Sequence, residues 1–209
     1  MDDQVSDNIK VVLQLAKDNN GKIYDSLMLS LPGLLESFYD NNDNHNIWSR
    51  NEKWTPMADS MFTFIQNSKY YGLYPSDYHL NELADLRKKL VDDTLAKTDA
   101  VTWTKADLML TDAFMKTARD IKEGRLLPDS VSITRKQKFI DSFFIKNLNE
   151  AGKYNSISEL FNSMEPIINN YQSLKYLVKN FVDSMDNTHY QYIAYPQKDS
   201  FHLVKTLQK

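Results

Sequence analysis

The sequence predicts an all-α fold: a single helical domain of about seven helices with an extended C-terminal tail. The chain has 209 residues, of which 42% are hydrophobic and 25% are charged, as in soluble globular domains. Its five Gly and six Pro occur singly, which favours long helices joined by short turns over a β-sandwich. Apolar residues also recur every three to four positions through most of the chain, which is the helical period.

Two helices are predicted near the N-terminus. The first, residues 5–17, has apolar residues on one face: Val5, Ile9, Val12, Leu13 and Ala16. It is polar elsewhere, so we expect residues 1–25 to form a loosely attached lead-in. The second carries Leu31, Leu34, Leu35, Phe38 and Tyr39 at helical spacing. The run "DNNDNHN" after it is expected to be a solvated loop.

The next helix, in "WTPMADSMFTFIQNSKYYG", has clear start and stop signals. Thr55 can cap it, Pro56 suits the first helical position, and Gly72 lies just past its end. Its expected buried stripe is Met57, Met61, Phe64 or Ile65, and Ser68. Such a stripe is far more often core than a cofactor site.

A fourth helix is predicted to start at Ser76. Ser76 is a good N-cap residue, and Asp77 would complement the positive end of the helix dipole. Its expected apolar face consists of His79, Leu83, Leu86 and Leu90.

The longest predicted helix runs from Thr104 to Gly124. Thr104 with Asp107 has the form of a capping box, although Asp is a weaker partner than Glu. The expected core face is Ala106, Leu110, Ala113, Phe114, Ala118 and Ile121. The expected outer face carries Asp112, Lys116 and Asp120, four residues apart, as ordinary i,i+4 pairs.

The remaining segments complete the predicted domain. Val131 and Ile133 alternate briefly before a helix that contains Phe139, Phe143 and Leu148. A short helix is capped by Ser156 or Ser158, and another starts at Pro166. Its stripe is Ile167, Tyr171, Leu174, Val178, Phe181 and Met185. We therefore predict a lead-in over 1–25, a helical domain over 26–188, and an extended tail or linker over 189–209, in which Tyr190, Tyr192, Ala194 and Pro196 lose the helical period.

Composition excludes several classes of protein. The net charge is −3 without a basic stripe, so nucleic-acid binding has no electrostatic footprint. No apolar run approaches the roughly 20 residues that span a bilayer, and the acidic N-terminus lacks the features of a signal peptide. An exported form would therefore be a mature or trimmed chain. The absence of Cys excludes a thiol nucleophile, a thiolate metal site and a disulfide, but it does not fix the compartment.

No motif predicts catalytic, metal-binding or cofactor-binding residues. The histidines His45, His79, His189 and His202 are scattered without the spacing of a zinc site. A G-x-S-x-G elbow and a glycine-rich phosphate loop are both missing from the sequence.

An acid-pair glycan hydrolase stays open as a less favoured alternative. Its candidate acids are Glu36, Glu123, Glu159 and Glu165. Glu123 precedes a helix-ending Gly and Glu165 precedes a helix-starting Pro, so both have structural reasons for their positions. This hypothesis predicts a cleft with two carboxyl groups about 5 to 10 Å apart.

Asp77, Tyr78 and His79 could form the edge of an active site or a helix joint. Consecutive residues of a helix point about 100° apart, so three neighbours would not converge on one substrate atom. We favour the helix joint.

The order of the joints carries a resemblance to a known family. One motif, G-L-x-P-x-D-Y-H, corresponds to Gly72, Leu73, Pro75, Asp77, Tyr78 and His79. A second, D-x-x-L-T-D-A followed by D-x-x-x-G-R, corresponds to Asp107, Leu110, Thr111, Asp112, Ala113, Asp120, Gly124 and Arg125. A third, L-x-P and a Tyr-led helix, has Met164 in place of Leu, then Pro166 and Tyr171. Over about residues 30–200 the chain resembles the scaffold domain of large bacterial L,D-transpeptidases, especially the forms of Bacteroidetes.

The resemblance implies a periplasmic or cell-envelope scaffold whose partner is the catalytic domain of the parent enzyme. That domain joins peptide stems of peptidoglycan through a Cys in an S-H-G-C-type motif. This chain has neither, so no catalytic residue is carried over and we expect no enzymatic activity and no cofactor. Peptidoglycan or envelope proteins are further expected partners. A free-standing helical adaptor that binds another protein is the alternative.

The positions of these motifs also have a physical interpretation as joints. Gly72 and Gly124 can supply positive φ at helix ends. Arg125 is expected to bond terminal carbonyls, or Asp112 or Asp120. Thr111 could bond back to the carbonyl of Asp107.

Overall fold

The computed structural model describes residues 1–24, 27–125, 139–168 and 170–185, and it confirms the all-α fold. The α-helices of these ranges are α1 (Asp2–Asp18), α2 (Pro32–Asp40), α3 (Pro56–Asn67), α4 (Leu80–Asp92), α5 (Thr94–Lys97), α6 (Ala100–Glu123), α7 (Asp141–Asn149), α8 (Ile157–Met164) and α9 (Tyr171–Met185). Three 3-10 helices are η1 (Ser68–Tyr71), η2 (Pro75–Tyr78) and η3 (Ala151–Lys153). The predicted alternation at Val131 and Ile133 and the predicted tail over 189–209 lie outside the described residues.

Two small antiparallel hairpins interrupt the helices. Strand β1 (Lys22–Ile23) pairs with β2 (Leu27–Met28), and β3 (Ser49–Arg50) pairs with β4 (Lys53–Trp54). A two-residue turn joins β3 to β4, and both of its residues have positive φ, 51° at Asn51 and 59° at Glu52. That backbone is the type I′ geometry of tight hairpins.

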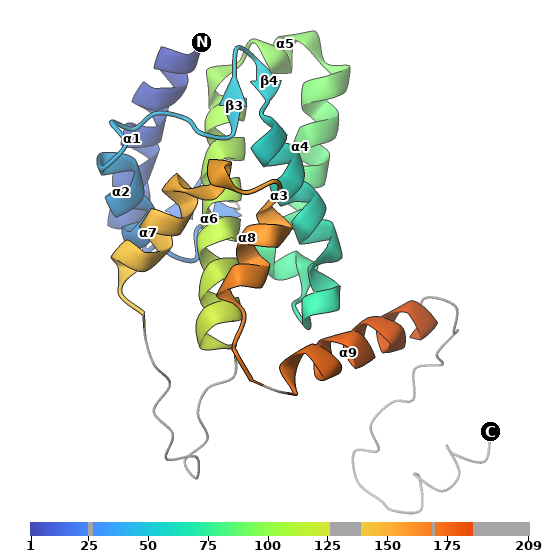
Figure 1. Cartoon of the computed structure of the whole chain (residues 1–209). Coiled ribbons are helices and arrows are strands. Elements are labelled where there is room, and N and C mark those ends of the chain that lie inside the picture. Colours follow the sequence, from blue (N-terminus) through green and yellow to red (C-terminus); the bar gives the residue numbers. More distant parts are fainter. Residues whose placement is uncertain (25–26, 126–138, 169, 186–209) are drawn as a thin grey trace, which may run out of the picture.

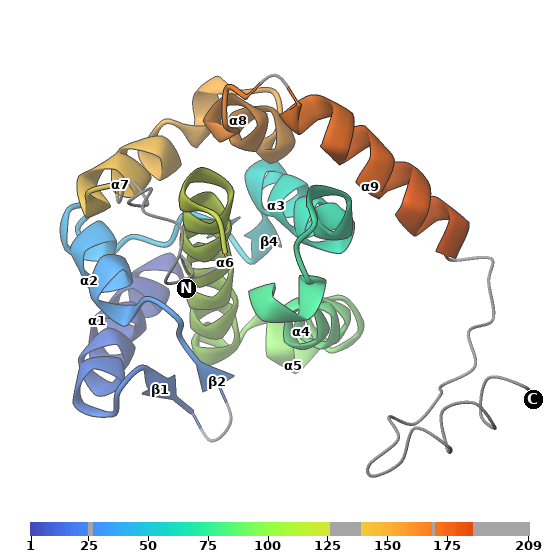
Figure 2. The same ribbon diagram turned by 90° about the horizontal axis from the view of Figure 1, so that it is seen from below.

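Helix α6 is the centre of the bundle. Figures 1 and 2 show α1, α2, α3, α4, α7 and α8 arranged around it, and each of these helices contacts it. Being surrounded, α6 buries polar residues as well as apolar ones, among them Asp107, Thr111 and Asp112. Those buried polar groups need hydrogen-bond partners from the surrounding elements.

The predicted start of this helix was wrong. Helix α6 begins at Ala100, because the carboxylate of Asp99 caps it by accepting from the backbone N–H of Val101 and Thr102, both at 3.1 Å. Thr104 and Asp107 are buried inside the helix and form no capping box. The predicted end is confirmed, since Gly124 follows the last helical residue with φ 75°.

Helix α1 is an integral part of the core, which corrects the expected loose attachment. The five apolar residues predicted on its face are all buried, and α1 packs on α6 and α2. It ends in a Schellman arrangement, in which Asn20 has φ 53° and the N–H of Gly21 donates to the carbonyl of Ala16 at 2.7 Å. The chain then turns into β1.

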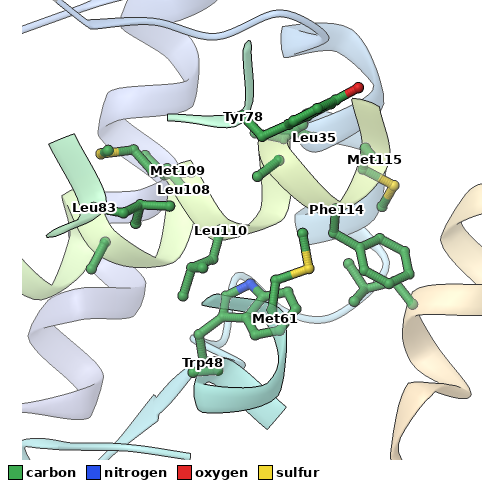
Figure 3. Close-up of a cluster of buried hydrophobic side chains, with 14 of the residues drawn as sticks. Leu35, Trp48, Met61, Tyr78, Leu83, Leu108, Met109, Leu110, Phe114 and Met115 are labelled. Carbon is green, nitrogen blue, oxygen red and sulfur yellow. The ribbon is translucent and has the colours of Figure 1, made fainter. Parts of the chain in front are cut away.

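Aromatic side chains connect the elements of the core. Trp48, which precedes the β3–β4 hairpin, lies fully buried beside Phe114 of α6 (Figure 3). Phe161 of α8 stacks against both Phe114 and Phe64, with ring centroids 5.1 Å and 4.5 Å apart. These rings join α3, α6 and α8 into one apolar core.

The signals of the third predicted helix are confirmed. The hydroxyl of Thr55 accepts from the N–H of Ala58, Pro56 is the first residue of α3, and Gly72 has φ 71° after η1. The expected stripe is buried at Met61, Phe64, Ile65 and Ser68.

Helix α9 differs from the other long helices. It starts at Tyr171 and not at Pro166, and it contacts the body mainly through η1. None of its residues is buried. Figures 1 and 2 show it projecting from the bundle beyond α8.

The turn after α1 provides a test of this fold. Gly21 has φ +89°, and a Cβ there would lie 2.7 Å from the carbonyl oxygen of Leu29. We expect Gly21→Ala to lower the free energy of unfolding by about 2 kcal/mol, because it combines the left-handed conformation with a backbone clash. Gly33→Ala is the control, since a Cβ at Gly33 meets nothing within 4 Å and Ala favours the helix. Urea denaturation measures both, and equal stability of the two variants would contradict the expectation.

Candidate functional site

The segment with Asp77, Tyr78 and His79 is a tight joint and not the first turn of a helix. Residues Pro75–Tyr78 form η2, and His79 follows in the left-handed conformation with φ 59° and ψ 28°. Helix α4 begins only at Leu80, so the expected N-cap at Ser76 was wrong. This backbone aims the three side chains differently from a regular helix.

All three side chains of the joint face α6 or Arg125, which lies two residues past its end. The carboxylate of Asp77 pairs with Arg125 at 2.5 Å, and the hydroxyl of Tyr78 donates to Asp120 at 2.7 Å. His79 Nε2 lies 2.8 Å from Asp112 Oδ2. We call these three contacts, which join Asp77, Tyr78 and His79 to Arg125, Asp120 and Asp112 respectively, the α6 seam.

The seam corrects two predictions about α6. Asp112, Lys116 and Asp120 do not pair with each other on an outer face, because each bonds to the joint; Lys116 Nζ donates to the carbonyl of Asp77 at 3.0 Å. Arg125 pairs with Asp77, and not with Asp112 or Asp120 as predicted.

Asp112 is the most heavily used carboxylate of the seam. It is fully buried, and its Oδ1 accepts from the backbone N–H of Ser30 at 2.8 Å and of Leu31 at 3.0 Å. Its Oδ2 accepts a hydrogen bond from Nε2–H of His79. Three donors from two distant segments therefore hold the entry to α2 and the joint against α6.

One turn earlier, Asp107 forms a second buried polar cluster. Its Oδ1 accepts from the hydroxyl of Tyr39 at 2.6 Å, and its Oδ2 accepts from the N–H of Trp48 at 2.9 Å and of Ile47 at 3.2 Å. Thr111 lies 2.7 Å from the Tyr39 hydroxyl and accepts from Trp48 Nε1–H at 2.8 Å. The hydroxyl of Thr111 is thus hydrogen-bonded to Tyr39 and Trp48, and not to the carbonyl of Asp107 as predicted.

Burial shifts the proton equilibria of this cluster. It raises the pKa of Asp107 to about 6, against the opposing effect of the hydrogen bonds from Tyr39 and from the backbone of Trp48 and Ile47. Burial and the neighbouring carboxylate hold the pKa of Tyr39 well above its usual range. In the seam, burial and the bond to Asp120 likewise raise the pKa of Tyr78.

These arrangements bond inward and offer little to a substrate. The side chain of His79 is 12% exposed and that of Asp112 is fully buried. The carboxylate oxygens of Asp107 and Asp112 already accept hydrogen bonds from other groups of the chain. The Asp77–Tyr78–His79 cluster is thus a structural joint, as favoured from the sequence, although the reason is its attachment to α6 and not a helical periodicity.

The four candidate acids lie in α2, in α6, in α8 and directly after α8, and each has a partner. Glu36 pairs with Lys17, and Glu165 pairs with Lys175. Glu123 accepts from the N–H of Phe139, and Glu159 accepts from Asn155. Glu123 also lines a cavity of about 310 Å³ with Asp120 and Arg125, but both of its acids already serve as acceptors within the chain.

The described residues were also compared with the requirements of a metal site and of a membrane-spanning helix. Across the described ranges, no group of three or more His, Asp or Glu side chains could hold a metal ion. His45 lies in an exposed turn, while His189 and His202 fall outside those ranges. None of the described helices is both long and apolar enough to cross a bilayer.

The family of the chain follows from a comparison with known families. A family model described as "Scaffold domain" matches residues 33–177, which is more than half of the chain. The chain belongs to the scaffold domain family. The match runs from α2 into α9 and includes the joint and all of α6. Comparisons with curated proteins and with solved structures found no match.

The sequence did not show how the polar residues of this scaffold domain are used. Asp112 and Asp120 have the spacing of surface residues, and Asp107 resembles a capping residue. The one signal that set them apart was their place in the family-like motifs, which marked them without giving their partners.

The buried carboxylate of Asp107 predicts a specific pH dependence. Its folded-state pKa of about 6 exceeds the usual 3.8, so the folded state binds its proton more tightly. Its stabilising contribution is therefore complete below pH 3.8 and is lost as the pH rises through 6, an amount of about 2 kcal/mol between pH 4 and pH 7. Asp107→Asn should remove this component. Urea denaturation of both proteins at pH 4 and pH 7 measures it, and identical pH dependence would contradict it.

Replacement of Asp112 tests the seam. Asp112→Ala leaves the backbone N–H groups of Ser30 and Leu31, together with the mostly buried His79, without this acceptor, so we expect a loss of about 3 kcal/mol in the free energy of unfolding. The matched control is Asp59→Ala, which breaks the partly exposed pair with Arg87 and should cost less than about 1 kcal/mol. Thermal or urea unfolding gives both values. If Asp112→Ala lowered the free energy of unfolding no more than Asp59→Ala does, the seam would not contribute to stability as expected.

Proposed function

We propose that this scaffold domain is a non-catalytic module of a cell-wall L,D-transpeptidase, acting in the periplasm or cell envelope. In this role it positions the catalytic domain that joins the peptide stems of peptidoglycan. Membership of the scaffold domain family and the ordered motifs from Gly72 to Tyr171 support the proposal. The chain contains no Cys, so the thiol nucleophile must come from another domain.

The observation that carries the proposal is the inward use of the motif residues. Asp77, Tyr78, His79 and Arg125 bond to one another or to α6, and Asp112 binds the entry to α2. A catalytic motif keeps at least one reactive group open to a substrate. Here the most distinctive residues hold helices in place, which is the work of a rigid support.

Helix α9 offers the surface that such a support needs. Leu174, Leu177 and Phe181 occur at i, i+3 and i+7, on one face of the helix, and are 60%, 59% and 61% exposed. We call these three residues the α9 stripe. A soluble protein rarely exposes such a stripe unless another surface binds it.

Polar contacts hold α9 to the body. Lys175 pairs with Glu165 at 2.5 Å and lies 3.8 Å from the ring centroid of Tyr71. Gln172 donates to the same carboxylate of Glu165 at 2.8 Å. Because these side chains anchor the helix on its other side, the α9 stripe faces away from η1, and we assign it to the contact with the catalytic domain.

The alternative is a helical adaptor that binds an unrelated protein. The α9 stripe is compatible with it, because an apolar helix face binds a groove of any suitable partner. The two functions differ in the partner, and the experiment below separates them.

The test uses a catalytic domain with an S-H-G-C motif, encoded in the same genome and produced as a separate chain. Calorimetry should detect its binding to the scaffold domain. Combined Leu174→Ser, Leu177→Ser and Phe181→Ser substitutions should weaken binding at least about tenfold, because burial of each apolar side chain contributes about 1.5 kcal/mol or more. Leu95→Ser, at an 80% exposed leucine of α5, is the control and should bind normally.

Activity assays complete this test. Mass spectrometry of tetrapeptide stems incubated with the scaffold domain alone should show no cross-linked product. Cross-linking by this chain alone would overturn the non-catalytic role. An absence of binding to the catalytic domain would favour the adaptor.

A further inference from the structure

A groove lies at the N-terminal end of α3, whereas α9 is anchored at η1, beyond the C-terminal end of α3. Its volume is about 720 Å³, within the range of about 300 to 1,000 Å³ typical of ligand sites. The β3–β4 hairpin, the start of α3 and the connection from η3 to α8 line it. Its apolar side chains include Trp54, Met57 and Ile157, and its charged side chains are Arg50 and Lys53. We call it the hairpin groove.

The two cations are directly opposite each other in the hairpin. Arg50 of β3 pairs with Lys53 of β4, so both side chains project from the same face. Like charges at such a position repel each other and destabilise a hairpin. An anion bound between them would remove that repulsion.

Neither cation has an acidic partner within the described ranges. The other arginines of those ranges, Arg87, Arg119 and Arg125, each pair with a carboxylate. Nearby acids are present at the turn, but Asp2 accepts from the N–H of Asn51 at 3.2 Å and lies with Glu52 around a separate cavity. Arg50 therefore differs from the other described arginines in having no carboxylate to bind.

Several other polar side chains of the groove are occupied, although Trp54 Nε1 is buried without a hydrogen-bond partner. Thr55 and Ser156 cap α3 and α8, and Ser60 accepts from the N–H of Ile157 at 2.9 Å. Asn155 donates to Glu159. Because the helix starts are capped by their own side chains, the attraction for an anion comes from Arg50 and Lys53.

We propose that the hairpin groove binds the carboxylate-bearing peptide stem of peptidoglycan. Arg50 and Lys53 would hold its carboxylates by charge-assisted hydrogen bonds, and the partly exposed Trp54 and Met57 would contact its small apolar side chains. The choice of a cell-wall stem rests on the proposed function. In that setting the groove holds a peptidoglycan strand on the scaffold domain, at a surface separate from the α9 stripe.

Calorimetric titration of the full chain with a synthetic tetrapeptide stem tests this proposal. Arg50→Gln and Lys53→Gln should each weaken binding about tenfold, and amidation of the carboxylates of the stem should have a similar effect. Lys88→Gln, at an exposed lysine of α4, is the matched control and should leave binding unchanged. The two groove variants should unfold at the same or a higher urea concentration than the wild type, because each removes a like-charge contact.

Three outcomes would overturn the proposal. They are the absence of stem binding, equal binding of the charged and amidated stems, and unchanged binding by both groove variants. Equally tight binding of an unrelated acidic peptide would overturn the assignment to the cell wall in favour of a protein partner. The titration contains no catalytic domain, so its failure leaves the test of the α9 stripe intact, and failure of that test leaves a positive titration standing.

Discussion

The structure depends on the burial of carboxylates in a helix that has neighbours on every side. Asp107 and Asp112 of α6 are 1% and 0% exposed, and a buried charge without partners costs several kcal/mol. The partners come from segments far away in sequence: Tyr39 and the 47–48 backbone for Asp107, and the 30–31 backbone and His79 for Asp112. Apolar packing brings the surrounding elements to α6, and these hydrogen bonds determine where along the helix they lie.

Because of this constraint, the residues that hold the fold together differ from the residues that we propose bind partners. The conspicuous polar residues, including the Asp77–Tyr78–His79 joint, are used inside the fold. In our proposals, recognition is left to surfaces with ordinary sequences, namely the α9 stripe and the hairpin groove. A scan for catalytic motifs passes over both surfaces, because neither an exposed leucine nor a pair of cations is distinctive until the fold shows its neighbours.

Local rules predicted what depends on local structure. Apolar spacing identified α1 and α6, and Thr55 with Pro56 located the start of α3, because capping and periodicity act within a few residues. The partners of Asp112 and Asp120 could not be predicted, since four-residue spacing is the same for charges that face water and for charges that face another segment. The β3–β4 hairpin was also missed. Its turn uses Asn51 and Glu52 with positive φ, whereas the recognisable signal for this turn is Asn-Gly.

The buried cluster and the groove are physically connected through that hairpin. A hairpin with two-residue strands is not stable alone, so its position must come from its surroundings. The backbone of Trp48 supplies this support: its N–H donates to Asp107, and its carbonyl accepts from the N–H of Thr55 at 2.9 Å. These bonds hold both ends of the segment that carries Arg50 and Lys53. The carboxylate of Asp107, although it contacts no ligand, therefore keeps the two cations opposite each other, and the same buried charge that organises α6 also positions the groove.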